Sequence, residues 1–344
     1  MLIPVIPDPH VGSVLDGKYE ITSVVGRGGM SVVYRARNVY TQQIVAVKML
    51  KQELVEDAEL TARFSREASA GIKMVHVNII GMHEVGTARS GQPYIVMDFL
   101  EGETLLRVLK KEGRVGVKRC VKILTQVCEA VAHMHNQKII HRDIKPGNIM
   151  LVETANDTDV VKMFDLGFAK IRGEPGTNRG DLTQFGDVLG TPLYMSPEQT
   201  QGHPLDSRSD IYSIGCVMYE MLCGSAPLVG SSVLETMQMQ VKEKPKALDE
   251  TRPDLYIPEQ LSNIAFQAME KDPDARYQSV SDLKRDLESV ALSLSGKMTS
   301  SVTLPGISKL KQLPPERPKP PIPIIIIGLL LACIIFFVVF SQHH

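Results

Sequence analysis

Residues 140–150, Ile-His-Arg-Asp-Ile-Lys-Pro-Gly-Asn-Ile-Met, place three chemically useful side chains close together. Asp143 supplies a carboxylate, Lys145 an ammonium group and Asn148 an amide oxygen. Apolar, β-branched residues flank them, and burying such a polar cluster is costly unless its groups have partners or a function. Phosphoryl transfer needs this set: a carboxylate that orients and deprotonates a hydroxyl, a cation beside the transferred group, and an oxygen ligand for magnesium. The segment therefore predicts phosphoryl transfer.

A second carboxylate, Asp165, follows the β-rich run 160–164 and precedes Leu166 and Gly167. An Asp-x-Gly sequence by itself is usually an ordinary turn. Here it follows Asn148 closely in the chain, and a carboxylate at the end of a strand is a suitable magnesium ligand. We therefore predict that Asn148 and Asp165 hold the metal ions that bridge the phosphates.

A glycine-rich stretch, residues 26–31, joins two expected strands at 19–25 and 32–37. Backbone amides of such a loop can approach phosphate oxygens without obstruction by side chains. The stretch lacks the Lys-Ser/Thr pair of a P-loop and lies in a strand hairpin, which disfavours Walker-type and Rossmann sites. It predicts a nucleotide cover.

The next expected strand, residues 44–50, carries one charged residue, Lys48, among apolar ones. A lysine on a buried strand must extend to solvent or pair with an acid. Glu67, on the expected helix 58–73, is the candidate partner that would orient Lys48 on the α- and β-phosphates. A surface lysine and a surface glutamate are the alternative that spacing alone leaves open.

The composition excludes some partners. The 344 residues carry 38 Lys and Arg against 39 Asp and Glu, and the net charge of -1 predicts no bulk attraction to nucleic acid. Five scattered cysteines without a Cys-x-x-Cys pair favour reduced thiols in a cytosolic domain: Cys120, Cys128, Cys216, Cys223 and Cys333. His133 and His135 would point to different faces of the expected core helix 117–135, so we expect no zinc site.

The run 322–340, IPIIIIGLLLACIIFFVVF, has no charged residue. As a helix it would span about 28 Å, close to the thickness of the hydrocarbon core. It predicts one transmembrane helix; a buried core helix is the alternative, but no amphipathic partner follows in the last residues, 341–344. Basic residues precede the run and place that side in the cytoplasm: Lys309, Lys311, Arg317 and Lys319. The expected localisation is a single-pass membrane protein with a cytoplasmic catalytic domain.

Two further regions flank the expected globular part. Residues 1–18 form an N-terminal extension that lacks the basic start and apolar core of a signal peptide. Residues 291–321, rich in Pro, Lys and Ser, predict an extended juxtamembrane linker.

Residues 19–290 resemble the catalytic domain of protein kinases, most of all the bacterial eukaryotic-like serine/threonine kinases. The resemblance rests on the segments above, on 190–198 (Gly-Thr-Pro-Leu-Tyr-Met-Ser-Pro-Glu), on Asp210 and on Arg276. It implies an α+β, two-lobed fold with a small β-rich N-lobe at 19–97 and a larger helical C-lobe at 101–290. Leu166, Ser196 and Val77 depart from the usual Phe, Ala and Pro, all away from the expected phosphate contacts.

The resemblance also implies roles for these residues. Asp143 would be the catalytic base, Lys145 would contact the γ-phosphate, and Lys48 with Glu67 would form the activating ion pair. Asp210 would brace the catalytic loop, and Arg276 would pair with Glu198. The implied cofactors are ATP and Mg²⁺, with Mn²⁺ as an alternative. The expected ATP contacts are Gly26, Arg27, Gly28, Gly29, Met30, Ser31, Val33, Ala46, Lys48, Met97, Asp98, Leu100 and Met150.

Lys145 and Thr191 indicate protein substrates with Ser or Thr acceptors. Arg142, beside the catalytic aspartate, suggests control by phosphorylation of the activation segment, because a phosphate opposite it could order that segment. Thr183 is the best acceptor by position and Thr177 the second. Autophosphorylation there, and a homodimer through the back of the N-lobe, are what the resemblance leads us to expect.

Two other classes stay in consideration. A pseudokinase scaffold on the membrane would keep the fold but lose a phosphate or metal contact, whereas Lys48, Glu67, Asp143, Asn148 and Asp165 are all present. A small-molecule phosphotransferase should lack Lys145 and the segment 190–198. Both are disfavoured.

Overall fold

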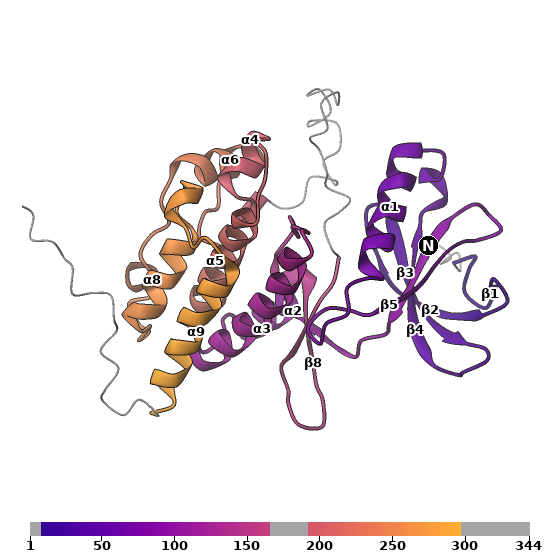
Figure 1. The fold of residues 1–344 in the computed structure, drawn as a ribbon, viewed down its shortest axis with the longest axis horizontal. Helices are drawn as coiled ribbons and strands as arrows, with labels where there is room; N and C mark the ends of the chain where they lie inside the picture. The colour runs from indigo at the N-terminus through magenta and orange to yellow at the C-terminus, as the bar shows by residue number, and fades with distance from the viewer. Residues whose placement is uncertain (1–7, 166–191, 297–344) are drawn as a thin grey trace, which may run out of the picture. The chain divides into compact units, whose positions relative to one another are not determined.

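The computed structural model describes residues 8–165 and 192–296, apart from the side chains of Arg63 and Glu67 (Figure 1). These residues form a β-rich N-lobe and a helical C-lobe, which confirms the expected two-lobed α+β architecture. The predicted linker was placed too early at its start, because residues 291–294 belong to helix α9 (Val280–Leu294). The rest of the predicted linker from 297 on, and the apolar run, lie outside the described residues. Within the described ranges, no helix is both long enough and apolar enough to cross a membrane.

The N-lobe is a six-stranded antiparallel sheet in the order β1-β2-β3-β4-β6-β5. Successive side chains along each strand point to opposite faces of the sheet, and both faces carry buried apolar residues. The strands are β1 (Val14–Leu15), β2 (Tyr19–Arg27), β3 (Ser31–Asn38), β4 (Ile44–Leu50), β5 (Met82–Thr87) and β6 (Pro93–Asp98).

Helix α1 (Ala58–Gly71) packs on this sheet. Its N-terminus is capped by Asp57, whose carboxylate accepts from the backbone N–H groups of Glu59 and Leu60. Phe64 and Ala68 face Leu50 and Ile95 of the sheet in one buried cluster. The helix thus carries Glu67 next to the strand that carries Lys48, although the Glu67 side chain itself lies outside the description.

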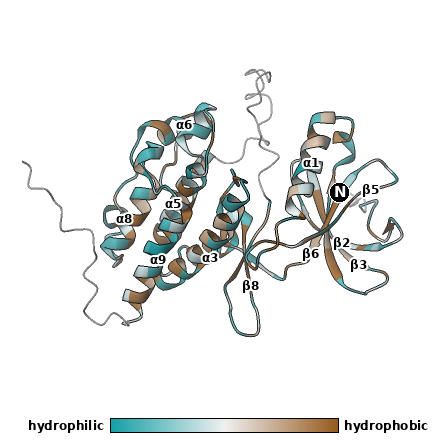
Figure 2. Ribbon diagram, in the orientation of Figure 1, coloured by the Kyte–Doolittle hydropathy of each residue, from teal (hydrophilic) through white to brown (hydrophobic). Residues whose placement is uncertain are grey.

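The C-lobe is built around α5 (Arg208–Cys223), of which every residue except Arg208 and Glu220 is buried. Such burial on all sides is typical of a central core helix. Figure 2 shows hydrophobic segments on the strands of the N-lobe and on the packed helices, with hydrophilic residues on outer turns such as those of α6. The surrounding helices are α2 (Leu105–Glu112), α3 (Val117–Asn136), α4 (Pro197–Gln201), α6 (Val233–Lys242), α7 (Leu248–Thr251), α8 (Glu259–Ala268) and α9 (Val280–Leu294).

A small antiparallel sheet presents the catalytic segment. It consists of β7 (Gly102–Thr104), β8 (Ile149–Val152) and β9 (Val160–Met163), in that order. A short 3-10 turn, η2 (Pro146–Asn148), leads directly into β8. The predicted metal ligands therefore flank two paired strands, because Asn148 precedes β8 and Asp165 follows β9.

The segment between α1 and β5 packs into the C-lobe, although the sequence placed it inside the N-lobe. Met74 and Ile79 belong to the C-lobe core. Asn78 donates through Nδ2 to the carbonyl of Val161 at 3.0 Å and to Gln126 Oε1 at 3.1 Å. From their position in the chain, these residues were predicted to belong to the N-lobe. Their apolar contacts and hydrogen bonds instead anchor them on the C-lobe.

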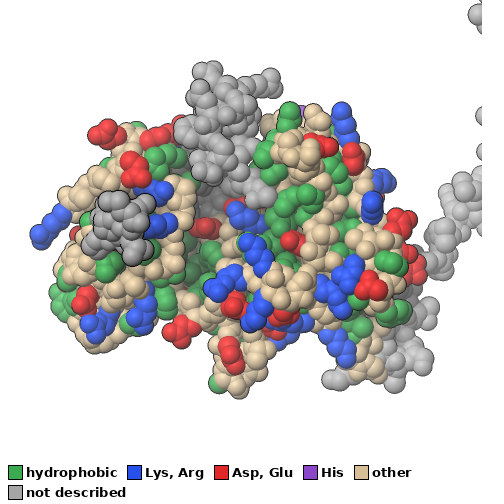
Figure 3. All heavy atoms as spheres, turned by 180° about the vertical axis from the view of Figure 1, so that it is seen from behind, with side chains coloured by type: hydrophobic (Ala, Val, Ile, Leu, Met, Phe, Trp, Pro, Cys, Tyr) green, Lys and Arg blue, Asp and Glu red, His purple; other side chains and the backbone are tan. Residues whose placement is uncertain are grey.

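The four described cysteines are buried and unpaired, as expected for small core residues: Cys120, Cys128, Cys216 and Cys223. Burial raises the pKa of the Cys216 thiol to about 12. On the face shown in Figure 3, basic and acidic side chains are interspersed.

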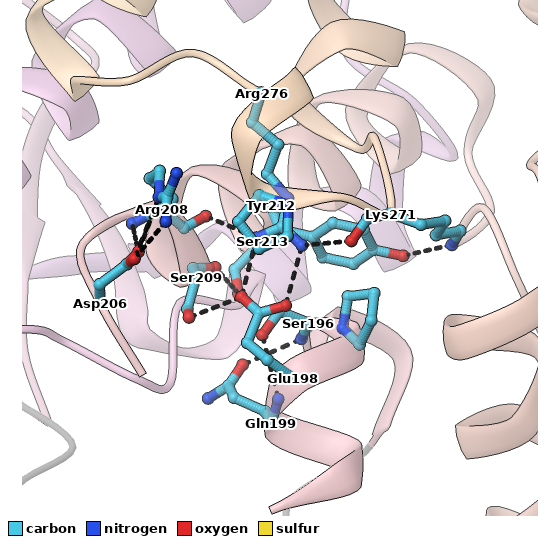
Figure 4. Close-up of polar contacts among 12 residues, drawn as sticks. Ser196, Glu198, Gln199, Asp206, Arg208, Ser209, Tyr212, Ser213, Lys271 and Arg276 are labelled. Carbon is cyan, nitrogen blue, oxygen red and sulfur yellow. Dashed lines mark hydrogen bonds and ion pairs between the residues drawn. The ribbon is translucent and has the colours of Figure 1, made fainter. Parts of the chain in front are cut away.

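A buried ion pair joins α4 to the segment before α9, as the resemblance implied (Figure 4). Both nitrogens Nη1 and Nη2 of Arg276 lie 2.8 Å from the carboxylate oxygens of Glu198, and the Arg276 side chain is fully buried. Ser209 Oγ adds a third bond to Glu198 at 2.7 Å. Burial alone would raise the pKa of this carboxyl, but the bonds from Arg276 and Ser209 outweigh it and lower that pKa. The stabilisation from Glu198 is therefore lost only as the pH falls through this lowered pKa.

We predict that Arg276→Ala lowers the free energy of unfolding by about 3–5 kcal/mol, because it leaves the Glu198 carboxylate buried without its charge partner. Arg285→Ala is the matched control, since Arg285 pairs with Asp282 at 2.7 Å on an exposed helix surface. The control should change stability by less than about 1 kcal/mol. Urea unfolding followed by circular dichroism measures the free energy of unfolding of both variants. An equal decrease in the two would contradict the stabilising role of the pair of Arg276 with Glu198.

Candidate active site

The backbone of the catalytic loop is hydrogen-bonded to one buried carboxylate, that of Asp210. Asp210, in the first turn of α5, is 1% exposed and accepts from the backbone N–H of His141 at 2.8 Å and of Arg142 at 2.9 Å. His135 Nε2 lies 2.7 Å from the same carboxylate. These bonds support a strained backbone, because Arg142 has a φ of 65°, in the left-handed region that costs a non-glycine residue about 1–2 kcal/mol.

The three polar side chains predicted from the loop meet around one carboxylate. Lys145 Nζ donates to Asp143 Oδ2 at 2.9 Å. Asn148 Nδ2 donates to the same oxygen at 3.0 Å and to the Asp143 carbonyl at 2.8 Å. These bonds hold Asp143 in one orientation, and its side chain keeps 16% of its surface exposed. The arrangement suits a base that must accept a proton from an incoming hydroxyl.

Lys48 and Asp165 bring the two lobes together at the site. Lys48 Nζ lies 2.6 Å from Asp165 Oδ1, with the Lys48 side chain 11% exposed and that of Asp165 48% exposed. Asp165 also has a positive φ, 54°. The N–H of the preceding Phe164 donates to the Asn148 carbonyl at 3.2 Å, which holds Asp165 beside the catalytic loop.

The apolar side of the site collects four of the predicted nucleotide contacts. Ala46 and Met97 are buried in one cluster with Ile80. Partly buried residues pack against this cluster: Val33, Met82, Phe99, Leu100 and Phe164. An apolar wall built from both lobes is suited to the flat face of a base. Met150, at the start of β8, pairs in register with Thr104 of β7.

The side chains of the glycine-rich turn make contacts in different parts of the N-lobe. The N–H of Gly28 donates to the Ser31 carbonyl at 2.8 Å and closes the turn between β2 and β3. Met30 packs towards the cluster around α1, and Ser31 is buried. The guanidinium of Arg27 bonds to Asp8, so only its backbone is available to a nucleotide on the opposite face. Asp98 accepts from the N–H of Gly81 at 2.9 Å.

The donor set fits magnesium. An amide oxygen from Asn148 and a carboxylate from Asp165 are the hard oxygen ligands that Mg²⁺ prefers, and such sites use few protein ligands beside substrate phosphates. Within residues 8–165 and 192–296 there is no cluster of three or more His, Cys, Asp or Glu side chains arranged for a metal ion.

Sequence reasoning missed one connection to the loop. Gln199 Nε2 donates to the Arg142 carbonyl at 2.9 Å, while its Oε1 accepts from the N–H of Ser196 at 2.9 Å. Ser196 and Gln199 form a capping box at the start of α4. The Ser-x-x-Gln spacing was a readable signal, and it explains why serine suits the position where the family usually has alanine.

The expected regulatory threonines, Thr183, Thr191 and Thr177, lie outside the described residues. Their expected receptor, Arg142, is described. Its Nε is buried and has no hydrogen-bond partner among the residues that the structure covers.

Residues 19–286 match the family model for the protein kinase domain. The chain belongs to the protein kinase family. Serine/threonine-protein kinase pkn3 of Myxococcus xanthus is 36% identical over 284 residues, which cover 82% of this chain and 52% of that protein. Serine/threonine-protein kinase PknB of Mycolicibacterium smegmatis is 36% identical over 276 residues, covering 79% and 43%. This kinase thus spans about half the length of the curated relatives it matches.

The kinase fold also matches solved structures. The crystal structure of the Mycobacterium tuberculosis PknI kinase domain aligns with a TM-score of 0.62, covering 81% of this chain and 98% of that one. Sequence identity in this alignment is 22%, so the likeness concerns the fold alone.

We predict that Asp210→Asn loosens the catalytic loop of this kinase. An asparagine has one oxygen in place of two, which leaves a buried backbone N–H of His141 or Arg142 without its acceptor and costs about 1–3 kcal/mol of stability. Hydrogen exchange of these two amides should become faster. Asp274→Asn, at an exposed carboxylate bonded to Arg208, is the control and should leave their exchange unchanged. Unchanged exchange in Asp210→Asn would refute the bracing role.

Proposed function

We propose that this kinase transfers the γ-phosphate of ATP to serine and threonine hydroxyls of proteins, within a catalytic domain spanning residues 19–290. The observation that carries the proposal is the approach of Lys48 Nζ to Asp165 Oδ1 at 2.6 Å, beside the Asp143, Lys145 and Asn148 cluster. Residues from both lobes meet where phosphoryl transfer needs a cation, a base and oxygen ligands.

Each side chain has a role in this mechanism. Asp143 orients the acceptor hydroxyl and takes its proton, while Lys145, bonded to Asp143, compensates charge on the transferred phosphoryl group. Lys48 would bind the α- and β-phosphates, with Glu67 of α1 as its predicted orienting partner. Asn148 and Asp165 would hold Mg²⁺, with Mn²⁺ as an alternative, and the metal would neutralise phosphate charge.

Serine and threonine specificity is supported by two lines of reasoning. Lys145 lies two residues after the base, and Thr191 follows Gly190 in the segment expected to face the substrate. The matched relatives pkn3 and PknB are both named serine/threonine-protein kinases.

Regulation by the activation segment is part of the proposal. The buried Arg142 Nε, without a described partner, could donate a charge-assisted hydrogen bond to a phosphate. We place that phosphate on Thr183, added by autophosphorylation. Phosphopeptide mapping of an active preparation tests this assignment, and an unmodified Thr183 would rule it out. A homodimer through the back of the N-lobe stays a prediction.

We predict that Lys48→Met and Asp165→Asn each lower phosphate transfer by at least about 100-fold, because they remove phosphate positioning and a metal ligand. Transfer of label from γ-labelled ATP to a generic basic protein, and to the kinase itself, measures the loss. The controls are Lys118→Met, on an exposed turn of α3, and Asp249→Asn, at the start of α7. Full transfer by the Asp165 variant would contradict its metal role, and no transfer by the wild type would favour a pseudokinase scaffold.

We also propose that residues 322–340 anchor the kinase in a membrane, with the 291–321 linker and the catalytic domain on the cytoplasmic side. The support is the uncharged run, long enough to span the hydrocarbon core, preceded by four basic residues.

Deletion of 322–344 should therefore move the protein from the membrane pellet to the supernatant, because it removes the apolar run. Deletion of 341–344 alone is the matched control and should leave the protein in the pellet. Fractionation followed by immunoblotting measures both. A 322–344 deletion that still sediments with membranes after a high-salt wash would argue against the anchor.

A further inference from the structure

Residues 8–15, which we call the N-terminal strap, run along the edge of the N-lobe sheet and belong to no part of the mechanism above. The strap is fixed to β2 by backbone bonds from Gly12 N–H to the Ile21 carbonyl and from Ile21 N–H to the Ser13 carbonyl, both 2.9 Å. Its last two residues form β1, which pairs with β2 (Figure 1). The strap is therefore an ordered part of the sheet.

The first residue of the strap, Asp8, has a buried carboxylate that is surrounded by hydrogen-bond donors. The side chain of Asp8 is 6% exposed. It accepts from Arg27 Nη2 at 2.5 Å, from the Tyr34 hydroxyl at 3.2 and 3.3 Å, and from the N–H of His10 at 3.0 Å. The ring of His10 packs edge-on against Tyr34, with centroids 5.7 Å apart. A carboxylate held by this many donors has one defined position.

A β-bulge directs Arg27 towards this carboxylate. In the β2–β3 pairing, Val24 lies opposite Tyr34 and Gly26 opposite Val33, so Val25 is an extra residue. Without it, strict alternation would place Arg27 on the face of Val33. With it, Arg27 lies opposite Val32, which shares the outer cluster with Tyr34.

Neighbouring strand residues point to opposite faces, and the bulge decides which face each of them takes. Val33 packs on the apolar cluster of the candidate active site, and its partner Gly26 lies on that face. Arg27, the next residue, is bonded on the outer face to the strap. The turn that would cover the phosphates is thus bonded to the strap on its outer face through the Arg27 side chain.

We propose that Asp8 is a positioning residue for ATP: through Arg27 it holds the glycine-rich turn 26–31 in the conformation that covers the phosphates. The inference rests on the proposed function. Glycine-rich backbone loses much conformational freedom when it is ordered, and a loop ordered beforehand leaves less of that cost to nucleotide binding. Asp8 contacts neither the nucleotide nor the acceptor, so its effect falls on ATP affinity and not on the chemical step.

The test uses the full chain carrying Asp8→Ala, Arg27→Ala, or both. We expect each single variant to raise the Kd and the KM for ATP about three- to fivefold, with kcat within about twofold of the wild type, as for loss of one partly exposed ion pair. Hydrogen exchange of the amides in 26–31 should become faster. The double variant should be no weaker than Arg27→Ala alone, because both changes remove the same contact.

Two further variants separate positioning from general damage. Asp8→Asn keeps an acceptor oxygen but loses the charge, so its Kd should lie between those of the wild type and Asp8→Ala. Glu20→Ala, on the same strand as Arg27, removes an exposed ion pair with Arg37 of β3 and should change neither the Kd nor the exchange of the turn. Hydrogen exchange and equilibrium ATP binding can be measured without turnover. A wild type that transfers no phosphate would therefore refute the proposed function, while these two measurements would still test the positioning role of Asp8. Unchanged loop exchange, an unchanged Kd, or additive effects in the double variant would overturn the inference.

Discussion

The catalytic centre depends on the carboxylate of Asp210. The loop that carries Asp143, Lys145 and Asn148 follows a defined path, which includes Arg142 in the left-handed region. Asp210 stabilises this backbone by accepting two of its N–H groups at 2.8 and 2.9 Å from the first turn of the most buried helix. The catalytic side chains are thereby attached to the core of the C-lobe. The hydrogen bonds offset the free-energy cost of burying a polar cluster between apolar strands.

The two lobes meet through contacts of different kinds. The ion pair of Lys48 with Asp165 lies in the site and leaves the carboxylate half exposed, as suits a group that must also meet a nucleotide and a metal. The segment around Asn78 lies behind it and is buried in the C-lobe core. The segment around Asn78 anchors the chain that follows α1 to the C-lobe, which also carries Asp143.

The N-lobe uses its sheet in two ways at once. Its inner face contributes Val33 and Ala46 to the apolar wall of the site, and its outer face carries the cluster on which the strap lies. A one-residue bulge in β2 decides which of the two faces Gly26 and Arg27 each take. Control of the phosphate-covering turn can thus come from the outer surface without any group entering the nucleotide site.

Residue types at close spacing were enough to predict phosphoryl transfer, whereas the two-lobed α+β fold was predicted from the resemblance to protein kinases. Asp143, Lys145 and Asn148 were readable as one unit, since six residues of chain cannot separate them far. The resemblance extended this to Asp210 and to the pair of Arg276 with Glu198, which the structure confirms. Tertiary structure alone decided the packing of 74–79 on the C-lobe and the direction of Arg27. Both depend on which distant surface a segment reaches, and a single bulge reverses a side chain's face without leaving a clear mark in the local sequence.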